Sequence, residues 1–190
     1  MKKEIRAIIN ESIAVKEKLL EDALIAPIIG LTKAVISCLK KGGKIILFGN
    51  GGSAADAQHI AAELVGRFIK ERKALAAIAL SCNSSNLTSI GNDYDFKQVF
   101  ARQIEGLGKS KDLAIGISTS GSSDNVLAGI FRAKTMAMKT AALTGGAGNK
   151  LAGIVDISVC VPSKNTARIQ EAHITIGHII CELTEKAFLV

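Results

Sequence analysis

The chain has 190 residues, the usual length of a single domain. Apolar residues make up 48% of it, aromatic residues only 4%, and tryptophan is absent, so we expect a core of Ala, Ile, Leu and Val under a helix-covered sheet. The net charge is +7, but the basic residues form scattered groups with few aromatic residues between them, so nucleic-acid binding is not expected. Such a surface instead attracts small phosphorylated molecules.

Apolar residues recur near helical spacing from Ile5 to about Lys41, and Pro27 predicts a break between two helices. Charges throughout the first helix argue against a signal peptide or a membrane span, so we expect a cytoplasmic protein that does not bind membranes. A leading helical hairpin either packs on its own sheet or contacts other subunits. We predict that residues 1–41 take part in a homo-oligomer.

After Gly42 the pattern changes to short apolar runs that alternate with helical segments. The expected strands are 44–48, 74–80, 113–117, 140–143 and 155–161. The expected helices are 54–69, 85–92, 96–106, 124–138 and 166–188. Helices of this length make right-handed crossovers, which predicts a three-layer α/β sandwich with a five-stranded parallel sheet. We expect a single domain, 1–190, with its α/β core at 42–190. The four cysteines have no metal spacing, and we interpret them as reduced packing residues.

Two of the expected strands lead into polar turns that contain glycine, at 49–53 and 118–123. Ligands collect at the carboxyl ends of strands in open parallel sheets, so both turns should face one crevice. Hydroxyls and the free amides of a helix start suit a phosphate group, although ordinary tight connections use glycine in the same way. The dinucleotide fingerprint and the Walker lysine pattern are both absent. We therefore favour a site for a phosphate monoester.

A third polar segment, 81–95, contains Asn92 and Asp93, which could hold sugar hydroxyls. The segment Gly91 to Asp93 is expected to be a turn. Local physics slightly favours the simpler interpretation, in which these two side chains only support a turn or cap a helix.

The three histidines lie on two expected helices. His59 and Glu63 are four residues apart, so they share one helix face and can supply two ligands to a zinc-like ion. Further ligands must come from elsewhere, and the last helix offers Gln170, Glu171, His173 and His178. Helical phase places Glu171 closest to His178, with Gln170 about 80° away, and does not by itself choose the partner.

Four motifs now stand in order: FGNGGSAADAQH at 48–59, IGND at 90–93, ISTSG at 117–121 and TARIQE at 166–171. Together they resemble the bacterial phosphoheptose isomerases of the sugar-isomerase (SIS) fold, and the resemblance spans nearly the whole chain. It implies a flavodoxin-like SIS domain, a homotetramer with active sites between subunits, and a phosphorylated seven-carbon sugar as substrate. The implied reaction converts sedoheptulose 7-phosphate to D-glycero-D-manno-heptose 7-phosphate through an enediol, the first step of bacterial ADP- or GDP-heptose synthesis.

The resemblance also implies roles for individual residues. The resemblance implies one zinc ion per active site, held by His59, Glu63, Gln170 and His178. At the start of the last helix it therefore favours Gln170 over Glu171 as the ligand. Glu63 matches the catalytic base and His178 the catalytic acid. Positions that contact the phosphate or the sugar are Asn50, Gly51, Gly52, Ser53, Glu63, Asn92, Asp93, Ser118, Thr119, Ser120, Ser123 and Gln170. Arg67 either assists the anion or is a solvated surface residue.

The chain departs from the family pattern at Ser81-Cys82-Asn83, where members commonly carry Thr and Asp, and this affects sugar contacts rather than the reaction type. Two other functions occur on the same fold. A noncatalytic SIS-fold relative binds the bacterial replication initiator, but it lacks the pair matched here by Glu63 and His178. Sugar-phosphate sensing modules normally carry a DNA-binding domain, and none fits this chain. The sequence therefore favours an enzyme.

Overall fold

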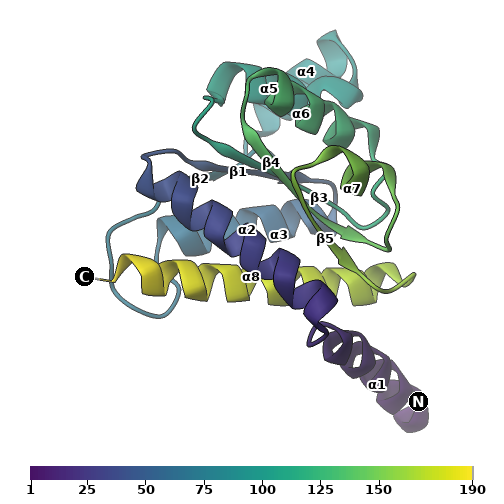
Figure 1. Ribbon diagram of the computed structural model, residues 1–190. Coiled ribbons are helices and arrows are strands. Elements are labelled where there is room, and N and C mark those ends of the chain that lie inside the picture. The colour runs from purple at the N-terminus through teal and green to yellow at the C-terminus, as the bar shows by residue number, and fades with distance from the viewer. Residues whose placement is uncertain (190) are drawn as a thin grey trace.

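The computed structural model describes residues 1–189, which fold around one central sheet (Figure 1). The strands are β1 (Ile45–Gly49), β2 (Ala77–Ala79), β3 (Leu113–Ser118), β4 (Lys139–Gly145) and β5 (Ile157–Val161). The helices are α1 (Lys2–Lys18), α2 (Asp22–Lys40), α3 (Gly52–Val65), α4 (Ser84–Asp93), the 3-10 helix η1 (Phe96–Gln98), α5 (Val99–Leu107), α6 (Asp124–Thr135), α7 (Lys150–Ile154) and α8 (Thr166–Phe188).

All neighbouring strands of the sheet are parallel, and their order is β2-β1-β3-β4-β5. The chain moves outward from β1 to β2, then returns and continues from β3 in the opposite direction. The order therefore reverses between β1 and β3, and a doubly wound sheet leaves a crevice at the carboxyl ends of such a strand pair. The predicted five-stranded parallel sheet is confirmed.

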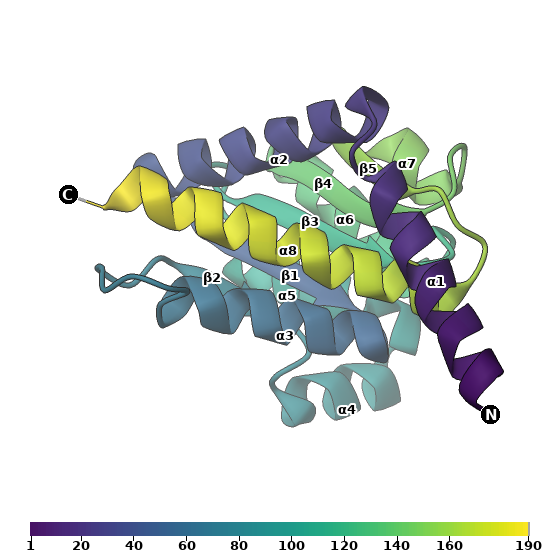
Figure 2. The ribbon, with the colours of Figure 1, turned by 90° about the horizontal axis from the view of Figure 1, so that it is seen from below.

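Helices cover both faces of the sheet, which confirms the three-layer sandwich. Helices α2, α3 and α8 lie on one face, and α5, α6 and α7 lie on the other (Figures 1 and 2). Successive strand residues point to opposite faces, so Ile45 and Leu47 pack under the first layer while Ile46 and Phe48 pack under the second. Strands β1 and β3 are buried along their whole length, as expected for central strands of a parallel sheet.

The predicted helix break at Pro27 is wrong. Pro27 lies inside α2, and the chain turns earlier, where Glu21 adopts an extended backbone before Asp22 begins the helix. A proline in the second helical turn removes one hydrogen bond near the start of the helix. The buried face of α2 offsets this loss, because most helical stability comes from tertiary packing.

The two N-terminal helices precede the sheet as predicted, but they pack differently. Helix α2 covers the sheet, with eight buried residues that include Leu31 and Val35. Among residues 1–189 it is the one helix long and apolar enough to cross a membrane, and its packing under the sheet layer accounts for that composition. Helix α1 crosses the start of α8 and projects from the body (Figure 2). Its isoleucines at positions 5, 8, 9 and 13 are about half exposed.

Smaller differences concern short elements. The sequence pattern did not reveal α7, because five residues are too few to display a helical period. Gly91 to Asp93 form the last turn of α4 rather than a separate turn. All four cysteines are free; Cys38 and Cys181 are buried as expected for packing residues, whereas Cys82 is exposed.

Candidate active site

The first polar turn connects β1 to α3 and depends on two glycines. Gly51 has a φ of +54°, a conformation that L side chains rarely adopt. A Cβ on Gly49 would lie 2.6 Å from the Ile117 carbonyl oxygen, so the missing side chain lets this turn lie against β3. The Asn50 carbonyl accepts from the amide of Ser53 at 3.0 Å. As at any helix start, the first turn of α3 leaves backbone amides free, which is what an anion site requires.

The second polar turn connects β3 to α6 and gathers hydroxyl groups. The Ser118 Oγ lies 3.0 Å from the Ser123 Oγ and 3.4 Å from the Ser120 Oγ. Gly121 has a φ of +62°, and a Cβ there would collide with the side chain of Asn149, which in turn caps α7. The hydroxyls therefore stand together at the start of α6, beside the first turn.

A pair of amides joins the two turns, and sequence reasoning missed one of its members. The side chains of Asn50 and Asn125 exchange two hydrogen bonds, each 2.8 Å long. Asn125 is the second residue of α6 and only 5% exposed. A buried polar side chain requires a partner. The only signal in the sequence was a polar residue at a buried position of α6, directly after the serine turn.

The histidine cluster forms where α3 meets α8. A Cβ on Gly177 would lie 2.7 Å from Ile60 Cδ1, so glycine allows the two helices to approach closely. His59 Nε2 lies 2.9 Å from His178 Nε2 and 3.3 Å from Glu63 Oε1. The ligand atoms of all three residues lie within 4.8 Å of one another. The Glu63 side chain is 22% exposed and that of His59 48%, so the cluster is open to solvent on one side.

This donor set fits a zinc ion, because two imidazole nitrogens and one carboxylate oxygen are common zinc ligands. Gln170, the fourth predicted ligand, lies at the start of α3. A Cβ on Gly52 would be 2.6 Å from its Nε2. Glu171 faces α1 instead, and accepts a hydrogen bond from Ser12 of that helix. It also pairs with Arg168, one turn earlier on α8. The geometry therefore removes Glu171 from the alternatives that helical phase left open.

Comparison with known proteins identifies the family. The family model described as SIS domain matches residues 9–145. A phosphoheptose isomerase of Roseiflexus sp. is 51% identical over 94% of this chain and 90% of that protein. Solved structures of phosphoheptose isomerases from Neisseria gonorrhoeae and Francisella tularensis share 42% and 40% identity, with TM-scores of 0.91 and 0.92. These matches cover 97% of this chain, and 98% and 97% of the two solved chains.

The chain belongs to the phosphoheptose isomerase family. The chain has its two polar turns at the switch point of the sheet, and the cluster of His59, Glu63 and His178 lies where α3 meets α8. The comparisons confirm the family and the fold that the four motifs predicted.

Not every predicted site residue joins this region of the isomerase. Asn92 and Asp93 are exposed at the end of α4, which packs on α5 and η1, in the layer opposite α3 and α8. Their side chains bond to each other at 2.9 Å. The Arg67 side chain is 60% exposed and pairs weakly with Glu71 at 3.9 Å. Within one chain, residues 1–189 bring none of the three to the cluster through a hydrogen bond or ion pair.

Two further titratable groups lie on the helices of the isomerase site. Burial raises the pKa of Asp56 to about 6, and the charge of nearby His59 opposes that shift. His173 is completely buried on α8, and burial lowers its pKa to about 4. His173 lies in the core and is not part of the group formed by the ligand atoms of His59, Glu63 and His178, so it is not one of the ligands.

Proposed function

We propose that the cluster of His59, Glu63 and His178 is where this isomerase converts sedoheptulose 7-phosphate to D-glycero-D-manno-heptose 7-phosphate. The convergence of these three side chains from two distant helices is the observation that supports the proposal. An aldose-ketose isomerisation needs a base for a carbon-bound proton and a second group that moves protons between oxygens. A carboxylate and an imidazole within reach of each other meet both requirements.

Glu63 is the base in this proposal. It removes a proton from C1 of the open-chain ketose, and the electrons of that C–H bond form the C1–C2 double bond of an enediol. The carbonyl electrons move onto the C2 oxygen, which takes a proton from His178. His178 then removes the proton of the C1 hydroxyl as the C1 carbonyl forms, and Glu63 returns its proton to C2. Both residues finish in their starting protonation states.

The serine turn and the glycine turn bind the phosphate in this proposal. Three hydroxyls, from Ser118, Ser120 and Ser123, stand at the start of α6, and Thr119 belongs to the same turn. The start of α3 supplies free backbone amides from the other side of the switch point, together with the side chain of Ser53. Asn50, Gly51 and Gly52 line this second side and contact the sugar.

A zinc ion fits the cluster and would be held by His59, Glu63 and His178, with Gln170 as the fourth ligand. When bound, zinc supplies a Lewis acid that polarises the sugar oxygens. Gln170 also reaches the start of α3, where it can contact the substrate. In the absence of the ion, His59 Nε2 and His178 Nε2 share a hydrogen bond of 2.9 Å, which holds the two imidazoles together.

We further propose a cytoplasmic homotetramer with active sites between subunits. The half-exposed isoleucines of α1 form one apolar stripe, because positions 5, 9 and 13 are four residues apart. An apolar groove of about 340 Å³ lies between the end of α1, α2 and α8. A neighbouring copy would also account for the expected substrate contacts of Asn92 and Asp93, because these two residues can reach an active site only if it belongs to another subunit.

Incubation of the purified protein with sedoheptulose 7-phosphate tests the proposed function. We expect an aldoheptose 7-phosphate to accumulate and, in the reverse direction, the ketose to form from it. Loss of a C1 proton to solvent deuterium should accompany turnover, because the base exchanges its proton with water. Absence of any aldose product from folded, metal-loaded protein would contradict the proposal.

A further inference from the structure

The connection between α3 and β2, residues 66–76, is held to α8 by a single buried carboxylate. Glu185 accepts hydrogen bonds from three successive backbone amides: Phe68 at 2.8 Å, Ile69 at 2.8 Å and Lys70 at 2.7 Å. Successive amides directed at one anion form a concave anion site of the kind usually occupied by an external ligand. Here the chain supplies its own anion.

Arg72 completes this arrangement on the other side of the carboxylate. Its Nε lies 3.5 Å from Glu185 Oε2, and both side chains are almost fully buried, 2% and 3% exposed. Burial alone would raise the pKa of Glu185, but the amides of Lys70, Ile69 and Phe68 and the charge of Arg72 hold it below its ordinary value. A buried charge is retained only when it is paired and hydrogen-bonded in this way.

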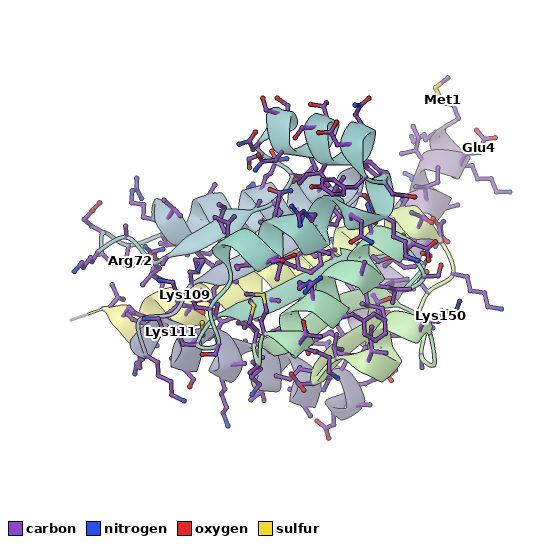
Figure 3. All side chains as sticks on the ribbon, turned by 90° about the horizontal axis from the view of Figure 1, so that it is seen from above. Met1, Glu4, Arg72, Lys109, Lys111 and Lys150 are labelled. Atoms are coloured by element: carbon purple, nitrogen blue, oxygen red, sulfur yellow. The ribbon has the colours of Figure 1, made fainter. Side chains whose placement is uncertain are left out.

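The guanidinium of Arg72 also binds the end of the helix that carries the proposed base. It donates to the carbonyl of Glu63 at 2.8 Å, and to the carbonyls of Leu64 and Gly66 at 2.8 and 3.1 Å. These groups lie in the last turn of α3 and just beyond it, where a cation satisfies free carbonyls and complements the helix dipole. Figure 3 places Arg72 at the end of the molecule where α8 ends.

The same connection carries a ring that touches the proposed acid. The ring of Phe68 lies 5.6 Å from that of His178, tilted by 44°, and the ring of His59 lies 5.1 Å from that of His178. The imidazole is thus bounded by one ring from α3 and one from the connection. Glu185 follows His178 by seven residues, two helical turns, so both lie on the face of α8 that meets α3.

We propose that Glu185 is a positioning residue of the isomerase site. Through the Phe68 amide it fixes the ring that orients His178, and through Arg72 it fixes the turn of α3 from which Glu63 projects. This inference rests on the roles proposed above for Glu63 and His178. The carboxylate itself is buried and does not touch the substrate.

The test compares Glu185→Gln with Glu182→Gln, an exposed change on the same helix that removes only a pair with Lys186. In Glu185→Gln one acceptor oxygen becomes a donor, so at least one of the three amides loses its partner. We expect kcat per folded molecule to fall by about 10- to 100-fold, the usual effect of removing a group that orients an active-site ligand. We expect KM to change less than about threefold, because phosphate contacts are untouched. Glu182→Gln should match the wild type.

Amide hydrogen exchange supplies a readout that does not depend on turnover. Exchange at Phe68, Ile69 and Lys70 should accelerate in Glu185→Gln and not in Glu182→Gln, in protein without metal. A lowered melting temperature with wild-type kcat would show a merely structural role and overturn the inference. Unchanged exchange together with unchanged kcat would also overturn it.

A second variant covers the case in which Glu185→Gln does not fold. Phe68→Leu leaves the Glu185 and Arg72 pair intact and removes only the ring beside His178. Reduced kcat with normal KM would support the inference, and wild-type kcat would overturn it. If the wild type itself failed to isomerise the sugar, the proposed function would fail and this inference with it. If the wild type is active and Glu185→Gln has the same kcat as Glu182→Gln, only the positioning role is overturned.

Discussion

The Nε2 atoms of His59 and His178 lie 2.9 Å apart, although 119 positions separate them in the chain. One imidazole belongs to the first crossover helix and the other to the last helix of the domain. The cluster therefore forms only when α8 docks beside α3, and Gly177 makes that close approach sterically feasible. Folding of the complete domain and assembly of the site are thus a single event.

Metal removal should abolish turnover reversibly. Two imidazoles and a carboxylate bind zinc strongly when their ligand atoms converge, as these do. We expect the protein as purified to contain about one zinc ion per chain by elemental analysis, and to lose activity on chelation and regain it when zinc is returned. Full activity in a sample shown to be free of metal would remove zinc from the account.

Asn125→Ala should weaken substrate binding more than it slows chemistry. The change leaves the Asn50 amide without its partner and frees the glycine turn from the serine turn. Loss of such a buried pair costs about 1 to 3 kcal/mol of stability. We expect KM to rise by about tenfold, or roughly 1.4 kcal/mol, with a smaller change in kcat. Steady-state kinetics and denaturant unfolding measure the two effects.

The double variant Asn50→Ala with Asn125→Ala is the control for this prediction. Because each amide serves the other, the second substitution should add little to the first, and the coupling should be about as large as a single effect. Strictly additive losses in binding would mean that the two residues act independently, and the link between the turns would then be incorrect.

The buried His173 should make stability depend on pH. Burial lowers its pKa from 6.5 to about 4, and contact with the Thr144 backbone opposes this only in part. The unfolded chain therefore binds more protons between pH 6.5 and 4, so the folded state loses stability as the pH falls through that window. The loss approaches about 3 kcal/mol below pH 4. Urea unfolding at several pH values measures it.

A matched variant assigns that dependence to His173. His173→Phe places an aromatic ring that cannot bind a proton at this position. The slope of unfolding free energy against pH between 6.5 and 4 should therefore become shallower. An identical slope in both proteins would place the titrating group elsewhere.

Ile9→Glu should weaken assembly. The isoleucine stripe of α1 is about half exposed in the single chain, and a carboxylate at its centre cannot be buried against another subunit without a large desolvation cost. Sedimentation should show a tetramer for the wild type and smaller species for the variant, with lower activity. Lys3→Glu, an exposed change on the same helix, should leave the assembly intact. A fully tetrameric Ile9→Glu protein would exclude this surface from the interface.

Most of the framework could be predicted from the sequence, because strands and crossover helices carry strong local patterns. The spacing of Val, Ile and Leu located all five strands, and α8 agrees in both bounds. Pro27 misled the prediction, since the rule against proline in helices ignores the packing that stabilises α2. The short α7 carried no period to detect.

The candidate site was predictable in its parts and not in its connections. His59 and Glu63 share a helix face by spacing alone, but the choice between Gln170 and Glu171 required the position of α1, which engages Glu171. The partners of Asn125 and Glu185 lie 75 and more than 100 residues away, so no local pattern could reveal them. Long-range polar pairs of this kind become visible only in three dimensions.

Turnover of sedoheptulose 7-phosphate by Glu63→Gln and His178→Ala tests the central claim most directly. Each change removes one proton-transferring group and leaves the core untouched, so both variants should fold and assemble normally while kcat falls by about 100- to 10,000-fold. Product formation should be followed by separation of ketose and aldose phosphates. Isomerisation at a rate close to the wild type by either folded variant would contradict the role assigned to that residue.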